Sequence, residues 1–70
     1  MTPKKLGNII KKRRKSLGIN QDEFCEIAGM AHHTQSNIES GKGNPTLLLL
    51  NKILDTLGME IEIKVKEDKK

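Results

Sequence analysis

Two adjacent histidines, His32 and His33, lie among short polar residues, and a single cysteine, Cys25, precedes them. Imidazole and thiolate groups can hold zinc, transfer protons or act as nucleophiles. Neighbouring side chains on a helix diverge by about 100°, so the two histidines cannot readily chelate one ion, and a zinc site would need further ligands. No nucleophile or pocket accompanies them for acid–base catalysis. We therefore expect no metal, no cofactor and no enzymatic activity, with a metal-binding protein as a distant alternative.

The composition indicates one small domain. The chain has 70 residues, of which 34% are hydrophobic, and Phe24 is its one aromatic residue. A chain this short often gains stability from disulfides, a metal or a second copy of itself. Cys25 is alone, which excludes an internal disulfide and is typical of a reducing cytosol. Since no signal peptide or long apolar run is present, we expect a cytoplasmic protein without membrane contact.

Charge is unevenly distributed along the chain. Residues 1–21 contain seven Lys or Arg and no acidic residue, whereas residues 22–70 contain six basic and nine acidic residues. The corresponding net charges, +7 and −3, sum to +4. Such an asymmetry indicates a polyanionic partner at one end of the molecule, with a solvated basic helix as the alternative.

Capping residues and glycines divide residues 1–58 into four predicted helices. Thr2 before Pro3 is typical of a helix start, and Thr46 can cap the last helix. Asn20, three residues before Glu23, has the spacing of a capping box. The predicted helices run from Pro3 to Gly18, from Asn20 to Gly29, over residues 32–40, and over about residues 47–57.

Apolar residues that recur at helical spacing define the expected core. They are Leu6, Ile9, Ile10 and Leu17 in the first predicted helix, Phe24, Cys25, Ile27 and Ala28 in the second, Met30 and Ile38 around the third, and Leu47, Leu50, Ile53, Leu54 and Leu57 in the fourth. Leu48 projects nearly opposite this last stripe, and Leu49 flanks it. We therefore expect Leu48 and Leu49 to form part of a surface that contacts a partner protein.

The apolar period changes after Gly58. Apolar residues then alternate with Glu and Lys, which is the pattern of a half-buried strand. The apolar residues are Met59, Ile61, Ile63 and Val65. A lone strand cannot satisfy its own backbone groups, so we expect the same segment of a second copy to pair with it across a two-fold axis. Residues 59–66 are thus the predicted dimerisation strand, its apolar face toward the helices, and residues 67–70 are a predicted frayed tail.

Two short helices joined by a tight turn at Gly29, the second of them largely polar, describe a helix-turn-helix. Residues 17–47 read LGINQDEFCEIAGMAHHTQSNIESGKGNPTL. This run resembles the Cro/cI-type (XRE) helix-turn-helix family in its Leu-Gly-x-x-Gln entry, its glycine turn, its Ile-Glu-x-Gly exit and the Asn-Pro-Thr-Leu opening of the next helix. The resemblance covers residues 6–58 and implies an all-α, lambda-repressor-like domain of four helices, followed here by a C-terminal strand. Residues 1–58 are therefore the predicted DNA-binding domain.

The resemblance implies that the third predicted helix reads DNA, with its first turn in the major groove. The implied base-reading residues are His32, His33 and Asn37, and Ser36 is added to them because its short side chain, like that of Thr34, could bond a base or a phosphate. Imidazole offers a donor and an acceptor, and Asn can bond an adenine edge in two places. The implied phosphate-binding residues are Gln21, Thr34, Ser40, Lys42 and Asn44.

Other positions have structural roles in the family. A glutamate near the end of the recognition helix often pairs with an arginine of the first helix, which implies an ion pair between Arg14 and Glu39. Cys25 stands where the family usually has alanine, so its thiol is expected to be buried. Ala31 replaces the usual Ser or Thr cap. Gln35 stands where a β-branched apolar residue is usual, so a different register of the recognition helix stays open.

We therefore predict a sequence-specific transcriptional regulator, a repressor that acts as a homodimer on a palindromic operator and is nucleoid-associated when bound to DNA. The C-terminal strand is most similar to that of HipB-type antitoxins, which repress their operon and hold a kinase-like toxin. The alternative function is an antitoxin that neutralises such a toxin through Leu48 and Leu49. A further alternative is a protein-interaction module that uses Leu48, Leu49 and Ile27 and binds DNA only incidentally.

Overall fold

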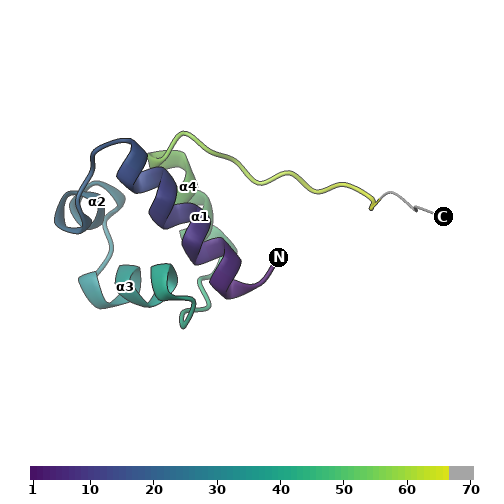
Figure 1. The fold of residues 1–70 in the computed structure, drawn as a ribbon, viewed down its shortest axis with the longest axis horizontal. Coiled ribbons are helices and arrows are strands. Elements are labelled where there is room, and N and C mark those ends of the chain that lie inside the picture. Colours follow the sequence, from purple (N-terminus) through teal and green to yellow (C-terminus); the bar gives the residue numbers. More distant parts are fainter. Residues whose placement is uncertain (67–70) are drawn as a thin grey trace.

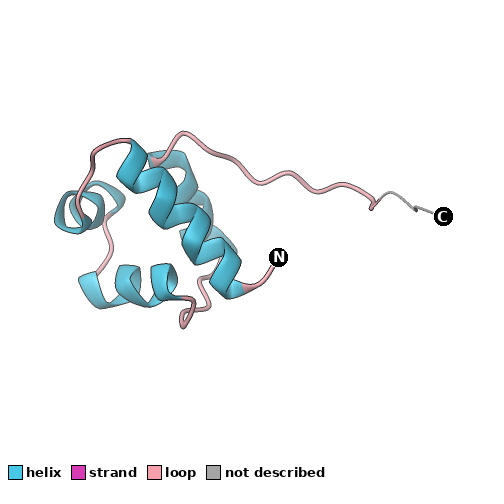
Figure 2. Ribbon diagram, viewed as in Figure 1, coloured by secondary structure: helices cyan, strands magenta, loops and turns pink. Residues whose placement is uncertain are grey.

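The computed structural model describes residues 1–66, which form four helices followed by an extended segment (Figures 1 and 2). The helices are α1 (Pro3–Ser16), α2 (Gln21–Ala28), α3 (His32–Ser40) and α4 (Leu47–Thr56). Their order and bounds confirm the four predicted helices. The predicted frayed tail, residues 67–70, lies outside the described residues. None of the helices within residues 1–66 is long and apolar enough to cross a membrane.

Local capping interactions explain where the helices begin. The hydroxyl groups of Thr2 and Thr46 each accept a hydrogen bond from the backbone amide three residues later, at 3.1 Å. At α2, Asn20 Oδ1 accepts from the Glu23 amide at 2.8 Å, and Glu23 Oε1 accepts from the Asn20 amide at 3.0 Å. This is the predicted capping box. Ala31 before α3 provides no side-chain cap, so the start of α3 depends on tertiary contacts.

Apolar side chains from all four helices meet in one core. Its centre consists of Ile10, Phe24, Ile38, Ile53, Leu54 and Leu57. Partly buried around it are Leu6, Ile19, Met30, Leu49, Leu50 and Met59. Phe24 is fully buried, so the one aromatic side chain of the protein fills the middle of this core.

Four residues that the sequence predicts in the core are exposed instead. Leu47, Ile27, Leu17 and Ile9 have 66, 62, 43 and 38% of their surface exposed. Leu47 is the first residue of α4 and lies at the edge of the core, whereas Ile53 in the second half of the helix is buried. Leu17 follows the last residue of α1, and Ile27 lies about 100° around α2 from the middle of its buried face. The predicted core placement of these four residues was therefore wrong.

Residues 59–66 lead away from the four helices as an extended segment (Figure 1). No β-strand is formed within residues 1–66. Met59 is half-buried against the core, and its amide donates to the Leu54 carbonyl at 2.8 Å. Ile63 and Val65 are 93 and 94% exposed. The single chain thus lacks the predicted strand, because a strand ladder needs a second strand to bond with.

Gly7 of α1 lies directly against the backbone of α3. A Cβ atom at Gly7 would lie 2.2 Å from the carbonyl oxygen of Ile38 and 2.8 Å from that of Glu39. A residue without a Cβ atom is therefore required for the two backbones to come this close. This contact sets the position of α3, the helix that carries most of the predicted site residues.

Candidate nucleic-acid interface

Glycines in the left-handed backbone region define both ends of α3. Gly29 ends α2 with a φ of 67°, and the next amide, that of Met30, donates to the Cys25 carbonyl at 3.0 Å. Gly41 ends α3 with a φ of 84°. These conformations favour glycine, because a Cβ atom would be strained there. The result is a short, fixed turn between α2 and α3, which is the geometry of a helix-turn-helix.

The buried residues of α3 show which of its faces points outward. Gln35, Ile38 and Glu39 have 1, 4 and 8% of their surface exposed. Successive side chains rotate by about 100°, so His33 and Asn37 lie on the side opposite these three residues. His33 is exposed and Asn37 half-buried. Ser36 and Ser40 are exposed beside them, and Thr34 is half-buried.

Burial of Gln35 means that α3 keeps this position toward the core even though the side chain is polar. The Gln35 amide Nε2 donates to Glu39 Oε2, one helical turn further along α3. The polar substitution is therefore accommodated by a hydrogen bond inside the molecule and not by rotation of the helix.

Arg14 and Glu39 lie together in the interior. Arg14 Nε donates to Glu39 Oε2 at 2.7 Å, and Arg14 Nη2 donates to Glu39 Oε1 at 3.1 Å. Arg14 Nη1 donates to the Ile19 carbonyl at 2.7 Å. Gln21 Nε2 also reaches Glu39 Oε1, at 3.5 Å. This buried polar cluster links α1, the loop before α2, the first residue of α2 and the last turn of α3.

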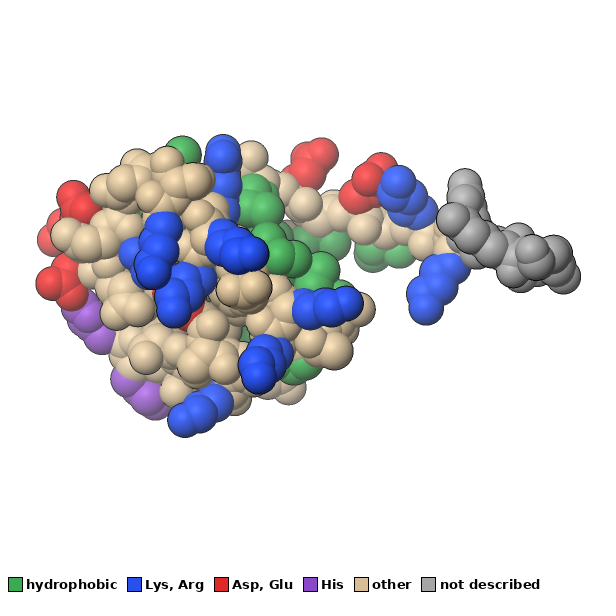
Figure 3. Space-filling view, in the orientation of Figure 1, with side chains coloured by type: hydrophobic (Ala, Val, Ile, Leu, Met, Phe, Trp, Pro, Cys, Tyr) green, Lys and Arg blue, Asp and Glu red, His purple; other side chains and the backbone are tan. Residues whose placement is uncertain are grey.

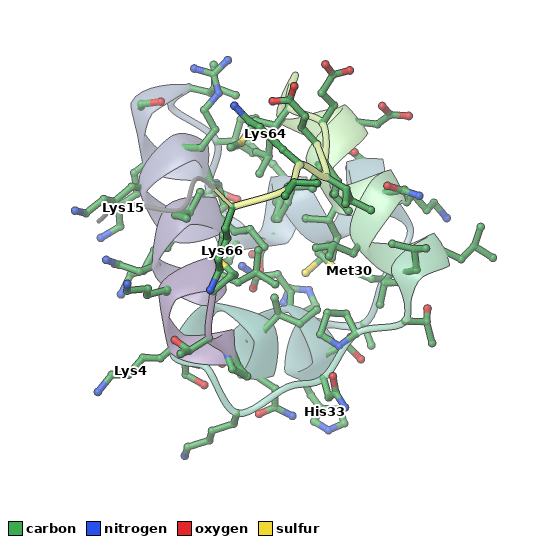
Figure 4. The ribbon with its side chains drawn as sticks, turned by 90° about the vertical axis from the view of Figure 1, so that its right-hand side faces the viewer. Lys4, Lys15, Met30, His33, Lys64 and Lys66 are labelled. Atoms are coloured by element: carbon green, nitrogen blue, oxygen red, sulfur yellow. The ribbon has the colours of Figure 1, made fainter. Side chains whose placement is uncertain are left out.

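His32 lies at the side of α3 that is nearest to α2. Its Nδ1 atom is 3.2 Å from Asp22 Oδ1, and both side chains are largely exposed. Even a charged pair this exposed contributes at most about 1 kcal/mol to stability, so this contact orients the imidazole more than it stabilises the fold. His33 has no such partner among the described contacts and projects from α3 (Figure 4).

The loop after α3 presents the remaining predicted phosphate contacts. The amides of Lys42 and Gly43 both donate to the Asn37 carbonyl at 2.9 Å, which folds the loop back against the end of α3. The side chain of Lys42 is exposed. Thr34, Asn37 and Asn44 line a hollow between α3 and this loop. The loop thus places a cation beside the outward face of α3.

Basic side chains are spread over the face of the molecule that α1 forms (Figure 3). Six of the seven basic residues in residues 1–21 are exposed; the seventh, Arg14, is buried with Glu39. Figure 4 shows Lys4 and Lys15 pointing outward from opposite ends of α1. The two histidines lie at the edge of this face, close to the acidic side chains of α2 (Figure 3). The positive field therefore comes mainly from α1, which packs against α3.

Cys25 is a buried residue of α2 and does not face solvent. Burial raises the pKa of its thiol, and the negative charges of Asp22 and Glu39 raise it further, while Arg14 lowers it. The thiol is therefore protonated and a poor nucleophile at neutral pH. Within residues 1–66 there is no group of three or more His, Cys, Asp or Glu side chains that could hold a metal ion.

Three of these contacts were not predicted from the sequence. The spacing of four residues between Gln35 and Glu39 would have allowed their contact to be anticipated, because such residues are neighbours on a helix. The Asp22–His32 pair and the reach of Gln21 to Glu39 join different helices. No pattern in the sequence indicates those distances.

The fold and the polar outward face of α3 define a helix-turn-helix protein. A family described as "Helix-turn-helix" matches residues 10–64, so the chain belongs to that family. It is 36% identical over 52 residues to an HTH-type transcriptional regulator of Methanothermobacter thermautotrophicus, covering 74% of this chain and 75% of that protein. It is 32% identical over 60 residues to the ImmF control region 10 kDa protein of Bacillus phage phi105, covering 86 and 67%. The family is one of DNA-binding transcriptional regulators and not of enzymes.

Solved structures also support the assignment to the helix-turn-helix family. A chain of the HipA–HipB–O2–O3 complex superposes with a TM-score of 0.82 at 30% identity, covering 96% of this chain and 94% of that chain. The restriction-modification controller protein C.AhdI from Aeromonas hydrophila superposes with a TM-score of 0.78 at 22% identity, covering 83 and 88%. At this lower identity, the second likeness shows the fold alone.

Proposed function

We propose that this protein is a sequence-specific DNA-binding repressor that acts as a homodimer on a palindromic operator. The observation that carries the proposal is the orientation of α3, which buries Gln35, Ile38 and Glu39 and turns a polar face outward. The proposed base-reading residues are His33, Ser36 and Asn37 on or beside that face, and His32 at the start of α3 on the side nearest to α2. They are short or planar groups, so α3 can approach the base edges in the major groove.

A second set of side chains is proposed to contact the phosphates and to position α3 without reading sequence. This set consists of Gln21, Thr34, Ser40, Lys42 and Asn44. Gln21 begins α2, where the helix dipole favours an anion. Lys42 lies in the loop directly after α3 and has an exposed side chain. The exposed lysines of α1 contribute a diffuse attraction to DNA.

We propose further that residues 1–58 form the DNA-binding domain and residues 59–66 the dimerisation strand. In one chain, Met59 anchors this segment on the core, while Ile61, Ile63 and Val65 are exposed. Antiparallel pairing with a second copy would satisfy the backbone and cover these side chains. Residues 60, 62, 64 and 66 are Glu, Glu, Lys and Lys, so this pairing sets acid against base, whereas parallel pairing sets like charges together.

A salt titration tests DNA binding directly. Binding through six or more phosphates falls by orders of magnitude between about 50 and 200 mM salt, because counterions are released from the DNA. Lys42→Ala should weaken binding to every sequence alike and reduce the salt slope by about one unit. Lys52→Ala removes a lysine of α4 outside the proposed contacts and is the matched control. Binding that does not change with salt would contradict the proposal.

The second candidate function is that of an antitoxin in a HipBA-like system. The favouring observation is the pair Leu47 and Leu48, which are 66 and 83% exposed at the start of α4. Leu49 is packed against the core, so its part in a partner surface is smaller than that of Leu48. The likeness to a chain of the HipA–HipB–O2–O3 complex also supports this candidate. A leucine pair beside other apolar residues can form the contact patch for a toxin.

A further inference from the structure

Gln35 is an unusual residue for the inner face of α3. Only 1% of its surface is exposed, and its Nε2 atom donates to Glu39 Oε2. Its Oε1 atom is buried and has no hydrogen-bond partner within the described chain. A buried acceptor without a partner carries a desolvation penalty, which an apolar side chain of the same length would not have. This penalty is similar in size to the gain from the Nε2 hydrogen bond to the Glu39 carboxylate, so Gln35 adds little net stability relative to such a side chain.

The hydrogen bonds beyond Gln35 lead to the proposed DNA contact. Glu39 Oε2 receives both Gln35 Nε2 and Arg14 Nε, which leaves its second oxygen, Oε1, to the remaining donors. Those donors are Arg14 Nη2 at 3.1 Å and Gln21 Nε2 at 3.5 Å. Arg14 thus holds both oxygens of the Glu39 carboxylate, Gln35 adds a second donor at Oε2, and the first residue of α2 meets Oε1.

The amide group of Gln21 suits a role between Glu39 and DNA. A glutamine amide carries two N–H donors. When one of them bonds to Glu39, the other stays available for a phosphate oxygen. A carboxylate acceptor also polarises the amide, which strengthens its second hydrogen bond. The orientation of Gln21 therefore depends on where Glu39 Oε1 is held.

We propose that Gln35 is a positioning residue for DNA binding, which acts through Glu39 to orient Gln21 toward the phosphate backbone. The inference rests on the proposed function, because it takes Gln21 as a phosphate contact. Gln35 itself touches no DNA. Its effect on affinity is therefore the same for every base sequence and is not accompanied by a matching effect on stability.

The test compares the full chain with Gln35→Met, an apolar substitution of similar length. The melting temperature and the affinity for a mixed-sequence duplex at low salt are measured for both. We expect Gln35→Met to melt at about the same temperature and to bind the duplex about threefold to tenfold more weakly, the effect of one weakened hydrogen bond to a phosphate. A merely structural Gln35 would lower the melting temperature and the affinity together, and that result would overturn the proposal.

A double-mutant cycle tests whether Gln35 affects DNA binding through Gln21. Gln21→Ala removes the end of the chain of hydrogen bonds, so Gln35→Met should cause no further loss of affinity in that background. Additive losses of affinity would overturn this role of Gln21.

Lys42→Ala separates this inference from the proposed function. If Lys42→Ala weakens binding and Gln35→Met does not, DNA binding stands and the role of Gln35 fails; if the unaltered protein does not bind the duplex, both fail.

Discussion

Replacing Gly7 with alanine should destabilise the fold, although alanine is the better helix former. The added Cβ atom would lie 2.2 Å from the Ile38 carbonyl oxygen and 2.8 Å from that of Glu39, both of them backbone atoms. Overpacking costs about 1–3 kcal/mol, and a clash with two backbone groups belongs at the upper end of that range. The gain in helix propensity offsets about 1 kcal/mol of it. The net loss in the free energy of unfolding is therefore about 2 kcal/mol.

For a domain of this size, that loss corresponds to a melting temperature about 8–16 °C lower. Circular dichroism during heating measures it. Asn8→Ala is the matched control, because Asn8 is the next residue of α1 and is exposed; it should raise stability by roughly 0.5 kcal/mol through propensity alone. If Gly7→Ala were as stable as Asn8→Ala, the backbones of α1 and α3 would not approach as closely as the structure shows.

Three further predictions concern other parts of the chain. A chain that ends at Gly58 should sediment as a monomer, melt at a lower temperature and bind a palindrome poorly, because it lacks the proposed dimerisation strand; a dimer of unchanged affinity would place the interface on the helices. Leu48→Glu should leave the fold intact, since Leu48 is 83% exposed, but weaken any complex with a toxin, and unchanged binding in pull-down and dimerisation assays would make Leu48 an ordinary surface residue. Burial raises the pKa of Cys25 in the folded state, so the thiol contributes stability below the unfolded thiol pKa of about 8.5, and this stability is lost as the pH rises further. Denaturant unfolding at increasing pH should show the loss in the natural chain and not in Cys25→Ala. A parallel loss in both proteins would refute this prediction.

Helix positions could be predicted from the sequence because their causes are local. Thr2, Asn20 and Thr46 cap helices within three residues of themselves, and a positive φ at Gly29 and Gly41 is a property of single residues. Burial is less local. Leu47 belongs to the apolar stripe of α4 by spacing, yet it is exposed, since the core does not reach the first turn of that helix.

Some contacts of the candidate site could likewise be predicted before the structure was known, and others could not. The family resemblance implied that Arg14 and Glu39 would meet, and the structure brings them to 2.7 Å. Two other contacts, of His32 with Asp22 and of Gln21 with Glu39, depend on the angle at which α2 and α3 cross. No sequence pattern predicts this angle. The alternation after Gly58 predicted a strand, but residues 59–66 are extended without forming one in the single chain. Strand pairing of that segment requires a second chain, so it is a contact between two molecules and not within one.

The measurement that tests the central proposal most directly is a comparison of binding-site preferences. Sites are selected from random duplexes with the natural protein, and affinities for single-base variants of the preferred site are then measured for Asn37→Ala and Lys42→Ala. We expect Asn37→Ala to lose about 1–3 kcal/mol on the preferred site and to relax the preference at one base pair. Lys42→Ala should weaken all sites equally. If Asn37→Ala left the sequence preference unchanged, the outward face of α3 would not be the surface that reads DNA.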